Sequence, residues 1–114
     1  MTDTIFLTIP AEARYRGVAT LVLGGIGSRA DLPYDRMDEL QLAVLSILDA
    51  GKGGDVSLQV VTGDESMTVS VGPLVKGSGT DDGLARVLLR LVDDVASERR
   101  DGEEWLTLRL STAG

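Results

Sequence analysis

Two neighbouring stretches of alternating residues constrain this chain more than any other feature of its sequence. Residues 56–60 and 66–71 each alternate apolar and polar side chains, and the polar segment 62–65 between them is typical of a turn. A period of two places the apolar side chains on one face of a β-sheet, and the short turn favours an antiparallel hairpin. The chain must therefore build an antiparallel sheet with an apolar face that needs a cover.

Three segments with apolar residues at helical spacing can supply that cover. They span residues 11–27, 37–48 and 84–95, and the third has the clearest pattern, with apolar residues at i, i+3, i+4, i+7, i+8 and i+11 from Leu84 to Val95. Further strands are expected at 4–9, 96–100 and 106–110, and a glycine-containing loop at 72–80. The order β-α-α-β-β-α-β-β predicts an α+β two-layer sandwich with three helices on one face of a mainly antiparallel five-stranded sheet.

Length and composition narrow the functional classes. A chain of 114 residues is expected to form one domain, 1–114, and the absence of cysteine and histidine excludes thiol nucleophiles, Ser-His-Asp triads and zinc sites of the usual kind. Eighteen acidic against 11 basic residues give a net charge of −7, which repels nucleic-acid backbones and anionic membranes. We therefore expect a protein that binds neither nucleic acid nor membranes directly. Its apolar runs are too short to span a bilayer, so we also expect it to be cytoplasmic.

Two segments, together with the order of elements, carry a resemblance to a known family. They are Met37-Asp-Glu-Leu-Gln-Leu-Ala-Val44 and Leu91-Val-Asp-Asp-Val95, the latter ahead of Glu98-Arg-Arg-Asp-Gly102. They resemble the histidine-kinase-like ATPase superfamily and, within it, the small bacterial anti-sigma-factor serine kinases. The resemblance implies a protein that binds ATP and a sigma factor and phosphorylates a serine on an antagonist protein.

This chain resembles the family's catalytic helix in its general pattern but not at the two positions that carry its chemistry. The resemblance places Ser46 where the family has its glutamate base and Ala50 where it has the asparagine that holds Mg²⁺. A serine without a neighbouring histidine is no general base, and alanine offers no oxygen to a hard cation. These positions predict neither a catalytic residue nor a metal site.

The nucleotide-binding motifs also depart from the family. Ser70 stands at the position of the adenine-reading aspartate, Gly72 is the one matching glycine, and Leu74 adds bulk. The glycine-rich segment 77–83 resembles a phosphate-binding loop, with Gly83 between the two family glycine positions. Its Asp81 and Asp82 would satisfy the helix N-terminus from within and repel a triphosphate.

We therefore expect an anti-sigma-like binding module that has lost ATP binding and kinase activity and uses no cofactor. An active ATP-dependent serine kinase with an unusual pocket and a purely structural dimerisation partner remain the alternatives. The −7 charge favours a basic partner surface on a sigma factor or another transcription regulator. An anti-sigma antagonist is a possible further partner, and a homodimer is left open. The residues expected to meet the partner are Asp81, Asp82, Asp93, Asp94 and Trp105.

The same residues also have simpler interpretations. Ser46, Ala50 and Ser70 are small residues that suit a helix and a strand without any catalytic use, and Trp105 is as readily covered by a neighbouring loop as exposed at an interface. Acidic residues at 35, 38 and 39 are expected to be solvated or to stabilise a helix N-terminus, because their spacing matches no metal-binding motif.

Overall fold

The five strands pair in the order β1-β2-β3-β5-β4, and every neighbouring pair is antiparallel. The structure is a computed structural model that describes residues 3–10, 12–49 and 54–112. The strands are β1 (Asp3–Ile9), β2 (Val56–Thr62), β3 (Ser66–Leu74), β4 (Asp94–Arg100) and β5 (Glu103–Ser111). The helices are α1 (Arg16–Arg29), α2 (Tyr34–Leu48) and α3 (Asp82–Leu91), with short 3₁₀ turns η1 (Ala13–Tyr15) and η2 (Ser78–Thr80) before α1 and α3.

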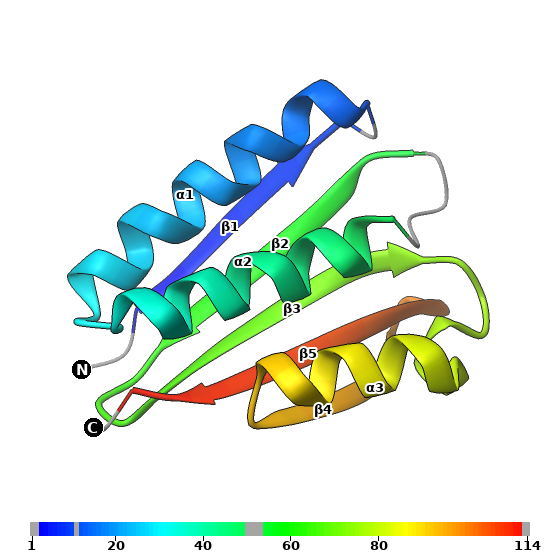
Figure 1. Ribbon diagram of the computed structural model, residues 1–114. Helices are drawn as coiled ribbons and strands as arrows, with labels where there is room; N and C mark the ends of the chain where they lie inside the picture. Colours follow the sequence, from blue (N-terminus) through cyan, green and yellow to red (C-terminus); the bar gives the residue numbers. More distant parts are fainter. Residues whose placement is uncertain (1–2, 11, 50–53, 113–114) are drawn as a thin grey trace.

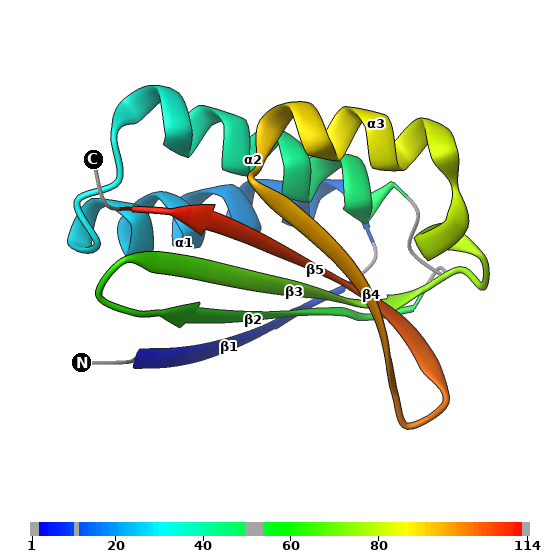
Figure 2. The ribbon, with the colours of Figure 1, turned by 90° about the horizontal axis from the view of Figure 1, so that it is seen from below.

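The helices lie on one face of the sheet, so the expected α+β sandwich is confirmed (Figures 1 and 2). The core forms between the layers because the alternating apolar side chains of the strands face the apolar stripe of α2. Its fully buried members include Leu23, Leu40, Val44, Ile47, Leu58, Met67, Val69, Leu88, Leu108 and Leu110. The helix α1 packs beside α2 and over β1, whereas α3 packs beside α2 on the other side.

The third helix ends four residues earlier than its apolar spacing predicts. Helix α3 stops at Leu91, Val92 is extended, and Val95 pairs with Leu108 as part of β4. The reason lies at Asp93, whose N–H donates to the carbonyl of Arg109 at 3.0 Å and so brings the chain onto the sheet. Val95 fits both the helical spacing of the preceding residues and the alternation of a strand, and its pairing with β5 places it in β4.

Two further boundaries differ from expectation. Strand β3 continues to Leu74, which is buried in the core, so the predicted loop begins after that residue rather than at 72. The first helix begins at Arg16 and ends at Arg29, whereas the spacing predicted residues 11–27. Both shifts leave the order and type of the elements unchanged.

The outer face of the sheet, which the helices leave uncovered, carries a polar network around Trp105. The Arg100 guanidinium stacks 4.4 Å from the centre of the Trp105 ring, and its nitrogens donate to Gln59 at 2.7 Å and to Glu98 at 2.8 Å. The ring is only 9% exposed and lies over Gly72, where a Cβ atom would clash with it. Trp105 is therefore covered by its neighbours, which favours a covered tryptophan over one exposed at an interface.

Within the described ranges, no helix is both long enough and apolar enough to cross a membrane.

Candidate functional site

The glycine-rich segment that resembles a phosphate-binding loop is closed by a carboxylate of the chain itself. Gly77 adopts a left-handed conformation, with φ of 94°, and begins the short turn η2. Its N–H donates to Oε1 of Glu104 at 3.2 Å, and the N–H of Gly79 donates to Oε2 of the same side chain. Two backbone donors that could meet an anionic ligand are thus engaged with a residue at the start of β5.

Close packing holds this loop against the β4–β5 hairpin. A Cβ atom at Gly79 would overlap the side chain of Ser97 on β4, so no larger residue fits there without movement. Thr80 Oγ1 donates to the carbonyl of Gly77 at 3.0 Å, and Ser78 Oγ donates to that of Val75. The loop is therefore a fixed turn whose polar groups bond to one another and to Glu104.

The first turn of α3 is capped from within, as the sequence predicts. Asp81 is the N-cap residue, and its Oδ1 accepts a hydrogen bond from the N–H of Leu84 at 3.0 Å. Asp82 and Gly83 follow in the first turn and are exposed. A second carboxylate beside the capped N-terminus adds negative charge where a phosphate would have to bind.

The electrostatics of the loop favour the ionised form of Glu104. The hydrogen bond from Gly79 N–H is the main cause that lowers the pKa of Glu104 below its ordinary value. Burial opposes it as the next largest effect, and the hydrogen bond from Gly77 and the charge of Arg99 lower the pKa further by smaller amounts. Glu104 is therefore ionised at neutral pH, and it is bound to the loop that resembles a phosphate site.

Of the two positions where the family has its glutamate and its asparagine, the structure describes Ser46 alone. Ser46 is half-buried, and its Oγ donates to the carbonyl of Leu42 at 2.9 Å, which is the ordinary contact of a serine within a helix. Ala50 lies outside the described residues.

Ser70 and Gly72 point to the opposite side of the sheet from the helices. Ser70 is 4% exposed and shares a 3.0 Å hydrogen bond with Thr107, which in turn donates to Glu98 at 2.7 Å. Its strand neighbours Val69 and Val71 face the helices instead. The sheet therefore separates Ser70 and Gly72 from Ser46 and Gly83, and the structure does not bring these four residues to one pocket.

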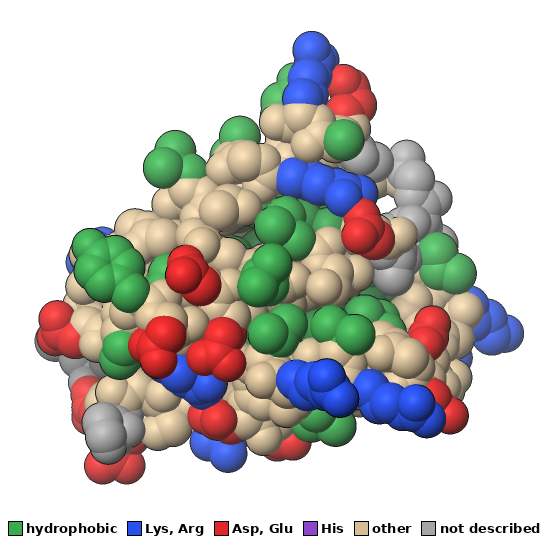
Figure 3. All heavy atoms as spheres, viewed as in Figure 1, with side chains coloured by type: hydrophobic (Ala, Val, Ile, Leu, Met, Phe, Trp, Pro, Cys, Tyr) green, Lys and Arg blue, Asp and Glu red, His purple; other side chains and the backbone are tan. Residues whose placement is uncertain are grey.

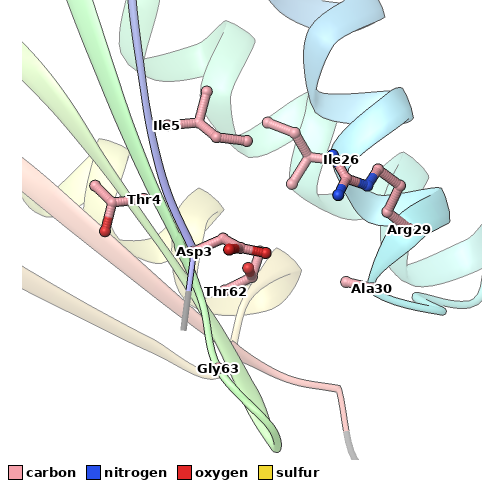
Figure 4. Close-up of a pocket in the computed structure, with 8 residues that line it drawn as sticks. All are labelled: Asp3, Thr4, Ile5, Ile26, Arg29, Ala30, Thr62 and Gly63. Atoms are coloured by element: carbon pink, nitrogen blue, oxygen red, sulfur yellow. The ribbon is translucent and has the colours of Figure 1, made fainter. Parts of the chain in front are cut away.

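A cavity of about 390 Å³ lies elsewhere, at the end of α1 (Figure 4). Arg29 and Ile26 line it from α1, whereas Asp3 and Thr62 line it from the sheet. The charges of Arg29 and Asp3 balance, so this lining does not favour a polyanion such as a nucleotide. A second cavity of about 490 Å³ lies between the end of α1 and the start of α2.

Of the four acidic residues expected at a partner surface, Asp81 and Asp93 also have structural roles within the chain. Asp93 accepts from Arg36 Nη2 at 3.0 Å and from the Ser111 N–H at 2.6 Å, so it joins the start of α2 to the end of β5. The bond from Ser111 is the main cause that lowers the pKa of Asp93, with Arg36 and Arg109 adding to it. Asp81 is the cap of α3, whereas Asp82 and Asp94 are exposed.

The roles of Glu104 and of the Arg36–Asp93 pair were not predicted from the sequence. A signal for Glu104 was present, because the alternation that places Leu106, Leu108 and Leu110 on the helix side places Glu104 there too. A carboxylate on a core-facing position needs hydrogen-bond partners. In the described part of the chain, no group of three acidic side chains is arranged to hold a metal ion.

Acid should weaken the fold because several carboxylates have lowered pKa values. Besides Glu104 and Asp93, the pKa of Glu98 is lowered, mainly by the hydrogen bond from Thr107 and then by Arg100. A carboxylate whose pKa is lower in the folded state stabilises the protein above its unfolded pKa of about 4, and this contribution is lost as pH falls through the folded pKa. We expect Glu104→Gln to be less stable than the wild type at pH 7 in urea denaturation, and we expect this difference to shrink as the pH falls below about 4. A difference of the same size in acid and at pH 7 would contradict the assignment.

Comparison with known proteins points to one group of kinases. No family model matches the chain. The serine-protein kinase RsbW of Listeria monocytogenes (serotype 4a, strain HCC23) is 32% identical over 79 residues, which are 62% of this chain and 50% of that protein. The serine-protein kinase RsbW of Bacillus velezensis is 43% identical over 42 residues, which are 37% of this chain and 26% of that protein. The chain is thus similar to these kinases over part of its length and spans about half the length of the Listeria relative.

Proposed function

We propose that this chain is an anti-sigma-like regulatory module that binds a protein partner and works without ATP. The similarity to RsbW kinases supports the relation to that family. The observation that carries the loss of nucleotide use is the engagement of the Gly77 and Gly79 N–H groups by Glu104. In this proposal the chain keeps the fold and the protein-binding surfaces but has lost the phosphotransfer activity.

The residues present do not fit Mg-ATP. A triphosphate at the glycine-rich loop would have to displace Glu104 and would also meet Asp81 and Asp82. Ser46 supplies no base, and Ser70 faces away from the helix layer in a bond to Thr107. Losing two charge-assisted contacts of roughly 1.5–3 kcal/mol each would weaken nucleotide binding by about two to four orders of magnitude.

The partner we propose is a sigma factor or another transcription regulator with a basic contact surface. The charge of −7 favours such a partner by long-range attraction, which acts mainly on the association rate. Affinity capture of partners from the native source, identified by mass spectrometry, tests the proposal. We expect a sigma factor or a transcription regulator, recovered equally with and without Mg-ATP. Recovery that requires ATP, or phosphorylation of a serine on a captured antagonist, would instead favour an active kinase.

Association with that partner should slow as salt increases. Raising the ionic strength from about 50 mM to about 300 mM shortens the screening length to well under 10 Å, so the association rate should fall while dissociation changes less. The double variant Asp82→Lys/Asp94→Lys should slow association at low salt, since both carboxylates are exposed and neither joins two elements of the fold. Surface plasmon resonance measures both rates. An association rate indifferent to salt and to these changes would argue against a basic partner surface.

A further inference from the structure

The cavity at the end of α1 carries opposite charges on two facing walls. Asp3 of β1 and Arg29 of α1 line it, and Figure 4 shows the carboxylate directed toward the helix and the guanidinium directed toward the sheet. Both residues are exposed, and among the described residues neither side chain forms an ion pair. A ligand that carries both signs of charge could therefore contact both of them.

The other walls of the cavity add a polar and an apolar contact. Thr62 of β2 pairs directly with Asp3 of β1, and both side chains lie on the helix side of the sheet. The half-buried Ile5 and the buried Ile26 form an apolar wall beside these polar groups. A few convergent polar groups next to an apolar wall are typical of a small-molecule site.

Backbone groups near the cavity are already engaged, so its side chains must select the ligand. The carbonyl of Ile26, in the last turn of α1, accepts from the N–H of Ala30 at 3.0 Å. On the sheet side, the N–H of Gly63 donates to the carbonyl of Ser66 at 2.8 Å. The volume of about 390 Å³ lies in the lower part of the range of roughly 300–1,000 Å³ that ligand pockets have, which favours a small ligand.

From these walls we infer that the cavity binds a small zwitterion with an aliphatic body, which is the chemistry of a free amino acid or a dipeptide. The ligand's carboxylate pairs with Arg29, and its ammonium group donates to Asp3 and Thr62. Its aliphatic side chain lies against Ile5 and Ile26. A polyanion would be repelled by Asp3 and a polyamine by Arg29. The inference is separate from the proposed function, because it uses neither the glycine-rich loop nor a protein partner.

Nuclear magnetic resonance titration of the purified chain tests this site, with leucine and dileucine as the two probes. We expect one probe to shift the backbone amide signals of Asp3, Arg29 and Thr62 with a dissociation constant below about 1 mM, and the tighter probe shows whether the ligand is an amino acid or a short peptide. The methyl ester and the N-acetyl derivative of that probe each lack one charge and should bind about tenfold more weakly. Failure of both probes to saturate the chain up to about 10 mM would overturn the inference. Shifts confined to other parts of the chain would also overturn it.

Two variants test which charge of the ligand each wall contacts. Arg29→Gln should weaken binding of the tighter probe about tenfold but change binding of its methyl ester by less than about threefold, because the ester has no carboxylate to lose. Asp3→Asn should weaken the probe and the ester but not the N-acetyl derivative, which lacks the ammonium group. The matched control is Arg86→Gln on α3, an exposed arginine outside the cavity, which should leave binding of all three unchanged. Equal weakening of the probe and its ester by Arg29→Gln would contradict the assignment.

Discussion

Trp105→Ala should lower the free energy of unfolding by about 3 kcal/mol and the melting temperature by roughly 10 °C. The indole is 9% exposed, covers Gly72 and lies under the Arg100 guanidinium at 4.4 Å. Its removal opens a space on the outer face of the sheet and leaves Arg100 without its aromatic partner. Urea denaturation followed by circular dichroism measures the change.

The matched control for this change is Phe6→Ala on the same face of the sheet. Phe6 lies on β1 and is 62% exposed, so its removal should change stability by less than about 1 kcal/mol. If Trp105→Ala left stability unchanged and instead accelerated dissociation of a protein partner, the ring would be an interface anchor, and its covered position would have to be reconsidered.

Asp93→Lys should destabilise the fold by about 2 kcal/mol, because it removes charge-assisted hydrogen bonds and places a second cation beside Arg36. This figure allows for the partial exposure of the pair, in which the Asp93 side chain is 41% exposed. The change acts where the chain leaves α3 and joins the sheet, so the start of α2 and the end of β5 should open first. Hydrogen exchange at Ser111, whose N–H donates to Asp93, reports that opening.

The neighbouring residue offers a close control. Asp94 is exposed, and its side chain accepts only from the adjacent Val95 N–H at 3.0 Å among the hydrogen bonds of the described residues. We expect Asp94→Lys to change stability by less than about 0.5 kcal/mol. Equal losses for the two variants would show that net charge, rather than the contacts of Asp93, controls stability here.

The elements of the fold follow from local pattern, whereas one boundary required tertiary information. Alternation at 56–60 and 66–71 predicts the β2–β3 hairpin because the apolar side chains must share a face. The end of α3 could not be predicted in this way. Val92 and Val95 continue its helical spacing, and the helix ends because the following chain pairs with β5, beginning with the bond between Asp93 N–H and the Arg109 carbonyl across 16 residues of sequence.

The candidate site was less predictable because its chemistry depends on contacts between distant segments. Capping of α3 by Asp81 is local and was predicted. The bonds from Gly77 and Gly79 to Glu104 join residues 27 and 25 positions apart, and no local pattern specifies them. The outward direction of Ser70 did follow from the alternation of β3, which places Ser70 on the face opposite Val69 and Val71. Assigning Ser70 to a family motif by its position in the sequence does not take the direction of its side chain into account.

Titration of Mg-ATP into the purified chain by isothermal calorimetry tests the proposed loss of nucleotide binding, with an RsbW kinase titrated under the same conditions as the positive control. We predict no saturable heat with this chain up to millimolar nucleotide, because Glu104 already binds the loop N–H groups and Asp81 caps α3. The Glu104→Gln variant, which removes the competing charge, keeps Ser46, Asp81 and Asp82 and should not bind either. A dissociation constant in the micromolar range for the wild-type chain would show that it still binds nucleotide and would contradict the proposed function.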